Sequence, residues 1–284
     1  MLSNQFQTDI TNIRSDAIHG AVHITLEVLK AIRNECIRTE PNIKLIKQMN
    51  EEIKTLHPEM ASLQSVKQSL KEFKKNKPKS KREYLDRIDV LTQRIKIKEN
   101  ITSKNLTKIL QKYNSIMTIS FSTTILNAFK FLPEDNRNKS IYVLESRAKR
   151  EGIIQAKKLA ELGFQVKLIV DSAASYYSKD ADIIVIGADT IFADGSILNK
   201  VGSMQLALLA KYKQIPFYVS ASTNKISTII PEDNAEYIRE QDADEVYKSN
   251  LKNLVSKNIY FDIVPKKLIT KIILDEDWKF FTKK

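Results

Sequence analysis

Apolar residues recur at intervals of three and four through the first third of the chain, which is the spacing of amphipathic helices. Similar stripes follow one another at residues 43–56, 60–70 and 85–110, and the first consists of Ile18, Val22, Leu26, Leu29, Ile32 and Cys36. Pro41 and the pair His57-Pro58 separate them. The pattern therefore predicts that residues up to about Tyr113 are almost wholly helical.

Near Ser115 the pattern changes to short apolar runs that alternate with helical segments. Strands are predicted at residues 116–119, 141–144, 166–170, 183–186 and 217–220, and helices at residues 122–129, 152–162 and 204–212. Such alternation is typical of right-handed βαβ units that build a mostly parallel sheet. We therefore predict an α/β protein with a helical domain at residues 1–114 and a sheet domain at residues 115–284.

The composition limits the chemistry that the chain can perform. Its 284 residues include one cysteine and three histidines, and no apolar run is long enough to span a membrane. We expect a cytoplasmic protein with a buried, structural thiol at Cys36. His19 and His23 are four residues apart, but no acidic motif accompanies them, so a helix face is expected here and no metal site.

Positive charge is concentrated in the helical domain, where residues 1–114 hold 22 Lys/Arg against 13 Asp/Glu, while the whole chain carries +12. The densest run, KKNKPKSKR at residues 74–82, predicts a connection between helices. Lysines bind nucleic-acid phosphates without sequence preference, so RNA binding is one hypothesis. A solvated surface is favoured over it, because no aromatic residues are interleaved with the lysines.

The stretch IIVIGADTIFADGSILNKVG, at residues 183–202, combines a buried strand with small and polar residues. Gly187 and Asp189 follow the strand at once, and Asn199, Lys200 and Gly202 come before the next predicted helix. Open α/β sheets bind ligands just beyond the carboxyl ends of their strands. The stretch therefore indicates a candidate ligand site.

The order Gly187-Ala188-Asp189, Asp194-Gly195 and Asn199-Lys200-x-Gly202 resembles the signature of the translation initiation factor 2B alpha/beta/delta family. That family includes two sugar-phosphate aldose–ketose isomerases, which act on methylthioribose 1-phosphate and on ribose 1,5-bisphosphate. The resemblance covers most of residues 15–275. It implies a helical domain, a Rossmann-like domain and a homodimer formed through the C-terminal domain. No glycine-rich dinucleotide loop is present, so no cofactor is expected.

The resemblance also assigns site residues. Asp189 matches the catalytic aspartate of the isomerases, and Asn199 and Lys200 match the polar pair that follows it. Arg147 and Gly152 match an Arg-x-x-x-x-Gly loop, in which Arg147 would hold an anion. Because loops after parallel strands share one edge of a sheet, we expect a single cleft that accepts a phosphorylated small molecule.

Each of these assignments has a local alternative. Arg147 could pair with Glu151 one helical turn away, and Asp171, at the end of another predicted strand, could cap a helix. Either contact would be structural and would leave the residue without a role in binding.

Three positions depart from the isomerase pattern. Ser120 stands where the isomerases have a catalytic cysteine, and His19, which precedes Gly20, and His57 stand where they have arginines. Serine is a weaker acid than cysteine, and imidazole is mostly neutral at pH 7.

These departures favour a non-catalytic scaffold or regulatory protein, similar to archaeal initiation factor 2B alpha-like proteins, with initiation factor 2 or related subunits as partners. His19, Gly20 and His57 would then line a retained pocket for a sugar phosphate or a nucleotide. The alternative is a ribose-1,5-bisphosphate isomerase-like enzyme.

Overall fold

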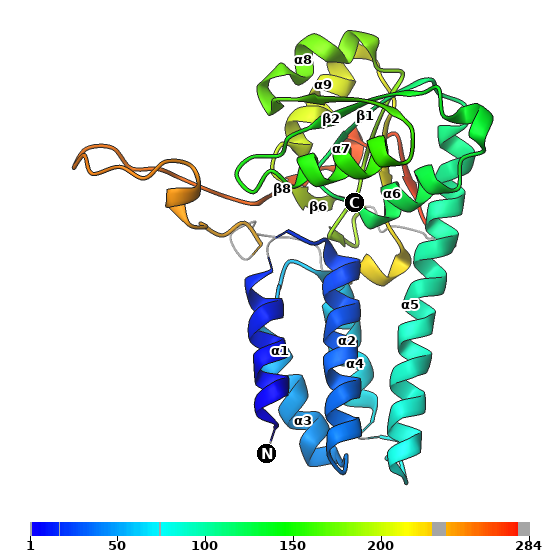
Figure 1. Cartoon of the computed structure of the whole chain (residues 1–284), viewed down its shortest axis with the longest axis vertical. Helices are drawn as coiled ribbons and strands as arrows, with labels where there is room; N and C mark the ends of the chain where they lie inside the picture. Colours follow the sequence, from blue (N-terminus) through cyan, green and yellow to red (C-terminus); the bar gives the residue numbers. More distant parts are fainter. Residues whose placement is uncertain (1, 17, 74, 229–236, 278–284) are drawn as a thin grey trace. The chain divides into compact units, whose positions relative to one another are not determined.

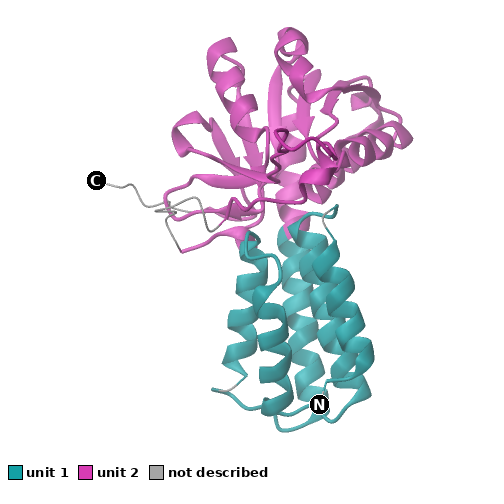
Figure 2. Ribbon diagram, turned by 90° about the vertical axis from the view of Figure 1, so that its left-hand side faces the viewer, with its two compact units in different colours: residues 1–98 teal, residues 99–284 magenta. Residues whose placement is uncertain are grey.

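The computed structural model describes residues 2–16, 18–73, 75–228 and 237–277, in two compact units, Met1–Lys98 and Glu99–Lys284 (Figure 2). The division falls within helix α5 (Lys81–Leu110), whereas the sequence placed it after residue 114, where helix gives way to sheet. The last turns of α5 belong to the sheet unit because their side chains donate hydrogen bonds to backbone carbonyls of that unit. Ser103 Oγ donates to the Thr124 carbonyl at 3.1 Å, and Thr107 Oγ1 donates to the Ala128 carbonyl at 2.9 Å.

The first unit is a set of helices packed side by side (Figure 1). Besides the start of α5 it contains α1 (Asn4–Ser15), α2 (Ala21–Arg38), α3 (Ile43–Glu52) and α4 (Ala61–Glu72). Side-chain oxygens of Ser3 and Asn42 cap α1 and α3 by accepting backbone N–H groups. The expectation of an almost wholly helical segment up to about Tyr113 is confirmed. Cys36 is fully buried, and this burial raises the pKa of its thiol to about 12, as expected of a structural cysteine.

The basic run connects α4 to α5, as its composition predicted. Of its described residues, Lys81 Nζ donates to the Ile37 carbonyl at 2.7 Å, and Arg82 lies 3.8 Å from Asp86. Lys74 lies outside the described residues. Among the described residues, no helix has the length and apolar character needed to cross a bilayer.

The second unit is built on a six-stranded parallel sheet in the order β3-β2-β1-β4-β7-β9. The strands are β1 (Ser115–Ile119), β2 (Ser140–Leu144), β3 (Gln165–Ile169), β4 (Ile183–Ile186), β7 (Phe217–Ser220) and β9 (Lys271–Ile273). The helices of this unit are α6 (Thr123–Lys130), α7 (Glu151–Glu161), α8 (Ala174–Tyr177) and α9 (Ser203–Lys213). The α/β fold predicted from the alternating pattern is confirmed.

Strand β4 lies at the centre of this unit, and all four of its residues are buried. Ile183 and Val185 pack into one apolar core, whereas Ile184 and Ile186 pack into another, on the opposite face of the sheet. Ile183 pairs with Ile116 of β1 in parallel register. Because both faces are covered, polar groups gather at the strand ends.

A second, antiparallel sheet contains β5 (Thr190–Ile191), β6 (Ile197–Lys200) and β8 (Phe261–Val264). The sequence placed Asn199 and Lys200 in a loop before a helix, and this was wrong because both lie on β6. They pair with Asp262 and Phe261 of β8, about sixty residues further along the chain. A pairing over that separation leaves no trace in a local pattern, and four residues are too few to show alternation.

Candidate functional site

The carboxyl ends of β1 and β2 carry two serines with unusual backbone conformations. Ser120 follows β1 and Ser146 lies just after β2, and both have φ of 65°. The Ser120 N–H donates to Ser146 Oγ at 2.7 Å. Non-glycine residues rarely adopt positive φ, and those that do concentrate at functional sites. The conformation marks this edge of the sheet as a candidate site.

Ser120, Glu151 and Lys200 form what we call the sheet-edge cluster. Ser120 Oγ donates to Glu151 Oε1 at 3.2 Å, and Lys200 Nζ lies 2.6 Å from the same oxygen. Glu151 is 4% exposed and Lys200 is 5% exposed. Two buried charges in contact stabilise one another, and removing either leaves the other unpaired. The cluster thus holds a carboxylate and an ammonium group at the end of β1.

Glu151 owes its position to the residue that follows it. A Cβ built on Gly152 would lie 1.8 Å from the carbonyl oxygen of Leu144, the last residue of β2. Only glycine therefore lets the first turn of α7 approach the end of β2 so closely. This accounts physically for the glycine in the Arg-x-x-x-x-Gly loop.

Two buried polar atoms on α7 lack a hydrogen-bond partner within the described part of the chain: Glu151 Oε2 and Gln155 Nε2. Gln155 is fully buried, and its other side-chain atom, Oε1, accepts the N–H of Ser122 at 3.2 Å. Residues four apart on a helix are neighbours on one face. An acceptor and a donor left unsatisfied beside Ser120 suit a ligand that carries hydroxyl groups.

Asn199 and Asp189 lie beside the carboxyl end of β4. A Cβ on Gly187 would be 3.2 Å from Ser122 Oγ and 4.0 Å from Asn199 Oδ1, so these three residues adjoin one another. Asn199 Nδ2 donates to Ser203 Oγ at 2.8 Å. The half-buried Asp189 donates its backbone N–H to the Leu198 carbonyl at 2.9 Å, which joins the loop after β4 to β6.

Arg147 does not contact the sheet-edge cluster directly. Its guanidinium donates to the carbonyls of Glu245 and Val246 at 3.0 and 3.4 Å. The alternative that paired Arg147 with Glu151 is wrong, since Glu151 pairs with Lys200, and the role of Arg147 in binding an anion stays a prediction. Asp171 does not act as a simple cap either, because its carboxylate accepts the N–H groups of Ser146 and Arg147. Arg147 therefore fixes the segment around residue 245.

That segment reaches the cluster through Tyr260. The Tyr260 hydroxyl donates to the Glu245 carboxylate at 2.6 Å, and Lys149 Nζ lies 2.5 Å from Glu245. Lys200 Nζ lies 4.9 Å from the centre of the Tyr260 ring, within cation–π range. Burial, followed by the contact with Glu245, raises the pKa of Tyr260 to about 12, so its hydroxyl stays protonated as a donor.

His19, Gly20 and His57 belong to the first compact unit, and their part in a shared pocket stays a prediction. Gly20 is the N-cap of α2. His57 Nδ1 lies 3.0 Å from Glu59, and its Nε2 lies 2.9 Å from the Ile13 carbonyl. Burial lowers the pKa of His57, but these two hydrogen bonds, together with the negative charges of Glu59 and Asp16, outweigh burial and raise it overall.

Sequence reasoning missed Gln155 and Tyr260 and considered Glu151 only as a partner of Arg147. Nothing in the local pattern distinguishes these residues, because Glu151 and Gln155 look like ordinary polar residues of a helix. The one available signal for Glu151 is its position directly before Gly152.

Asp262 provides a pH-dependent test of the local structure. Its carboxylate accepts the N–H groups of Gly202 and Met204 at the start of α9, but burial outweighs these bonds and raises its pKa to about 6. The folded state therefore binds this proton more tightly than the unfolded chain, and stability falls as the pH rises from about 4 through about 6.

In Asp262→Asn the side chain at this position cannot titrate. The free energy of unfolding of this variant, minus that of the parent chain, should therefore increase by about 2–3 kcal/mol between pH 4 and pH 7. Urea denaturation at both pH values measures this, and a pH-independent difference would contradict it.

Comparison with known proteins shows similarity to one group. Residues 17–276 match the model of the Initiation factor 2 subunit family. The chain is 30% identical over 281 residues to a ribose 1,5-bisphosphate isomerase of Methanocaldococcus jannaschii, an alignment that covers 93% of this chain and 87% of the relative. It is 37% identical over 163 residues to the protein of the same name from Archaeoglobus fulgidus, covering 57% of this chain and 52% of that relative. The crystal structure of translation initiation factor eIF-2B from Pyrococcus horikoshii has the same fold, with a TM-score of 0.84, 24% identity and coverage of 96% of each chain.

Proteins named as initiation factors and proteins named as sugar-phosphate isomerases thus both resemble this chain. The names of the relatives favour the isomerase alternative over the non-catalytic role that the sequence analysis placed first.

Proposed function

Because the chain belongs to the initiation factor 2 subunit family, we propose that it is an aldose–ketose isomerase whose substrate is a phosphorylated pentose of the ribose 1,5-bisphosphate class. The substrate class is that named in the M. jannaschii and A. fulgidus relatives. The observation that carries the proposal is the sheet-edge cluster, with its buried carboxylate beside the serine that replaces the cysteine.

The reaction moves a hydrogen between two neighbouring carbons of the sugar and opens its ring, because the phosphate on C1 holds the substrate as a cyclic acetal. C2 loses its hydrogen and the proton of its hydroxyl and becomes a carbonyl. C1 gains one hydrogen and keeps its phosphate, and the ring oxygen O4 gains a proton as the C1–O4 bond breaks. Oxidation at C2 balances reduction at C1 within one molecule, so no external oxidant takes part. The protein must supply groups that accept and return protons and that stabilise charge on the oxygens.

The sheet-edge cluster offers such groups. A serine alone is a poor replacement for a thiol, but the Ser120 hydroxyl already donates to Glu151, which can accept its proton. Lys200, in contact with Glu151, offsets the negative charge of its carboxylate. In the proposal, Glu151 Oε2 and Gln155 Nε2, which lack other partners among the described residues, bind substrate hydroxyl groups.

Asp189 is the second acid–base group in this proposal, and Asn199 orients a substrate oxygen. Both lie beside the carboxyl end of β4, where ligands of open α/β sheets bind. Roles in phosphate binding for Arg147, His19 and His57 are part of the same proposal. Arg147 would need to exchange its carbonyl contacts at residues 245 and 246 for the phosphate.

The direct test is turnover of ribose 1,5-bisphosphate by the full chain, followed by ³¹P and ¹³C NMR of the ketose product. We expect a kcat on the order of one per second or faster. Asp189→Asn should lower it by about 100-fold or more, because the amide cannot accept a proton. Absence of ketose at saturating substrate would refute the isomerase.

A second candidate function, an initiation factor 2B alpha-like scaffold, is favoured by the replacement of one cysteine and two arginines at Ser120, His19 and His57. It predicts no turnover together with stable binding of initiation factor 2 or a related subunit. Measuring both properties on one preparation separates the two functions.

We further propose that the chain forms a homodimer through its second unit. Strand β3 is an edge strand, and Leu168, Val170 and Tyr176 on it or just after it are 47%, 53% and 63% exposed. An edge strand with exposed apolar side chains is suited to association with another chain. Light scattering at micromolar concentration should give twice the 32.6 kDa mass of the chain, and the double variant Leu168→Lys/Val170→Lys should shift it toward the monomer. A monomeric parent chain, or a variant that remains dimeric, would contradict this interface.

A further inference from the structure

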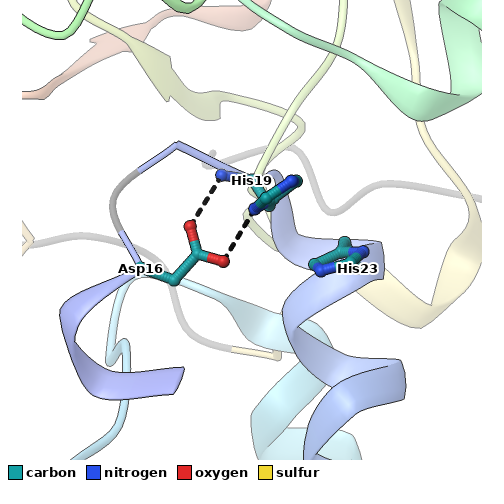
Figure 3. A group of neighbouring side chains, drawn as sticks. All are labelled: Asp16, His19 and His23. Atoms are coloured by element: carbon teal, nitrogen blue, oxygen red, sulfur yellow. Dashed lines mark hydrogen bonds and ion pairs between the residues drawn. The ribbon is translucent and has the colours of Figure 1, made fainter. Parts of the chain in front are cut away.

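Three potential metal ligands meet in the first unit, and one of them, His19, is also a residue of the phosphate site proposed above. Asp16 follows α1, His19 lies in the turn before α2, and His23 lies in the first turns of α2 (Figure 3). One ligand atom from each residue lies within 4.8 Å of the other two. The sequence indicated no acidic partner for the histidine pair, but the turn between α1 and α2 brings Asp16 to it.

The carboxylate of Asp16 is held in place by the turn. Its Oδ1 accepts the N–H groups of Ile18 and His19, each at 3.0 Å, and its Oδ2 lies 2.7 Å from His19 Nδ1. One oxygen therefore fixes the orientation of the carboxylate while the other points toward the imidazole, as Figure 3 shows. Metal ligands are commonly oriented by second hydrogen bonds of this kind.

The two imidazole rings are stacked, with centroids 4.1 Å apart and planes 26° from parallel. The rings are close enough that one nitrogen of each lies within 4.8 Å of the other and of a carboxylate oxygen of Asp16. His19 is exposed, whereas Asp16 and His23 are partly buried, so the group is open to solvent on one side. The structure gives no hydrogen bond from the His23 ring to any other described residue.

We propose that Asp16, His19 and His23 bind one divalent transition-metal ion, with zinc the best match to the ligand set. Two imidazole nitrogens and one carboxylate oxygen are a known zinc-binding set, which leaves a fourth position for water or another ligand. Bonds of about 2.0–2.1 Å in a tetrahedron separate ligand atoms by about 3.3 Å. This value lies between the 2.7 Å that separates Asp16 Oδ2 from His19 Nδ1 and the 4.8 Å within which all three ligand atoms lie. The proposal does not depend on the isomerase activity.

The test titrates the full chain, freed of metal by a chelator, with Zn²⁺ by calorimetry and with Co²⁺ by visible absorption. We expect one equivalent of each ion to bind. Asp16→Asn and His23→Gln should each weaken the affinity by about 10-fold or more, because each removes one ligand. Glu27→Gln, which changes a partly exposed carboxylate further along α2, serves as the matched control and should bind like the parent chain.

A measurement on the parent chain guards against variants that fold poorly. In ¹H–¹⁵N spectra of the three imidazoles, one equivalent of Zn²⁺ should shift the ring signals of His19 and His23 far more than those of His57, which interacts with Asp16 only through its charge. Unchanged ring signals of His19 and His23, no saturable binding, or full affinity in either ligand variant would overturn the proposal.

Discussion

Replacing Glu151 with glutamine is expected to lower the kcat for ribose 1,5-bisphosphate isomerisation by about 100-fold or more. The amide has the shape of the carboxylate but cannot take the proton of Ser120, which donates to it at 3.2 Å. A steady-state assay of the ketose product measures the effect. Glu161→Gln is the matched control, because Glu161 is an exposed residue of the same helix α7 and should leave kcat unchanged.

Loss of the ion pair with Lys200 is a second effect that the experiment must separate from catalysis. Glu151→Gln leaves a buried ammonium group without its charged partner, which costs about 3–5 kcal/mol, whereas replacing both members of such a pair is often nearly neutral. The double variant Glu151→Gln/Lys200→Met should therefore recover most of the free energy of unfolding. It should not recover kcat. If stability and activity return together, Glu151 has a structural role only.

A second large effect on stability is expected for Gly152→Ala, which should lower the free energy of unfolding by at least about 3 kcal/mol. The added Cβ would lie 1.8 Å from the Leu144 carbonyl oxygen, and both groups are backbone or bound directly to it, so neither can rotate away. Helix α7 must then move away from β2 and carry Glu151 with it. Urea denaturation measures the loss.

Gly163→Ala is the control for the general cost of replacing a glycine. Gly163 has φ of +89°, and a Cβ there would meet no atom within 4 Å. Alanine in this left-handed conformation should lower the free energy of unfolding by about 1–2 kcal/mol. Equal losses in the two variants would mean that the close contact of α7 with β2 contributes nothing beyond ordinary backbone strain.

Several parts of the candidate site could be read from the sequence because they follow from the sheet. The predicted strands at residues 116–119, 141–144 and 183–186 correspond to β1, β2 and β4, and parallel strands bring their carboxyl ends to one edge. Ser120 and Asp189 could be assigned to that edge in advance. The contact between Ser120 and Glu151 could not, since it depends on how deeply α7 approaches β2.

The sequence by itself determined the helical first third, the parallel sheet and the family. Each depends on local periodicity or on a motif with fixed spacing, and both are properties of consecutive residues. Only the tertiary structure decided which side chains meet. It placed Lys200 on β6 opposite β8, paired it with Glu151 on α7, and turned Arg147 toward residues 245 and 246. It also brought Asp16 to the two histidines. Such contacts join segments that are brought together by turns and by packing, and their geometry is set by the whole core rather than by the residues that take part.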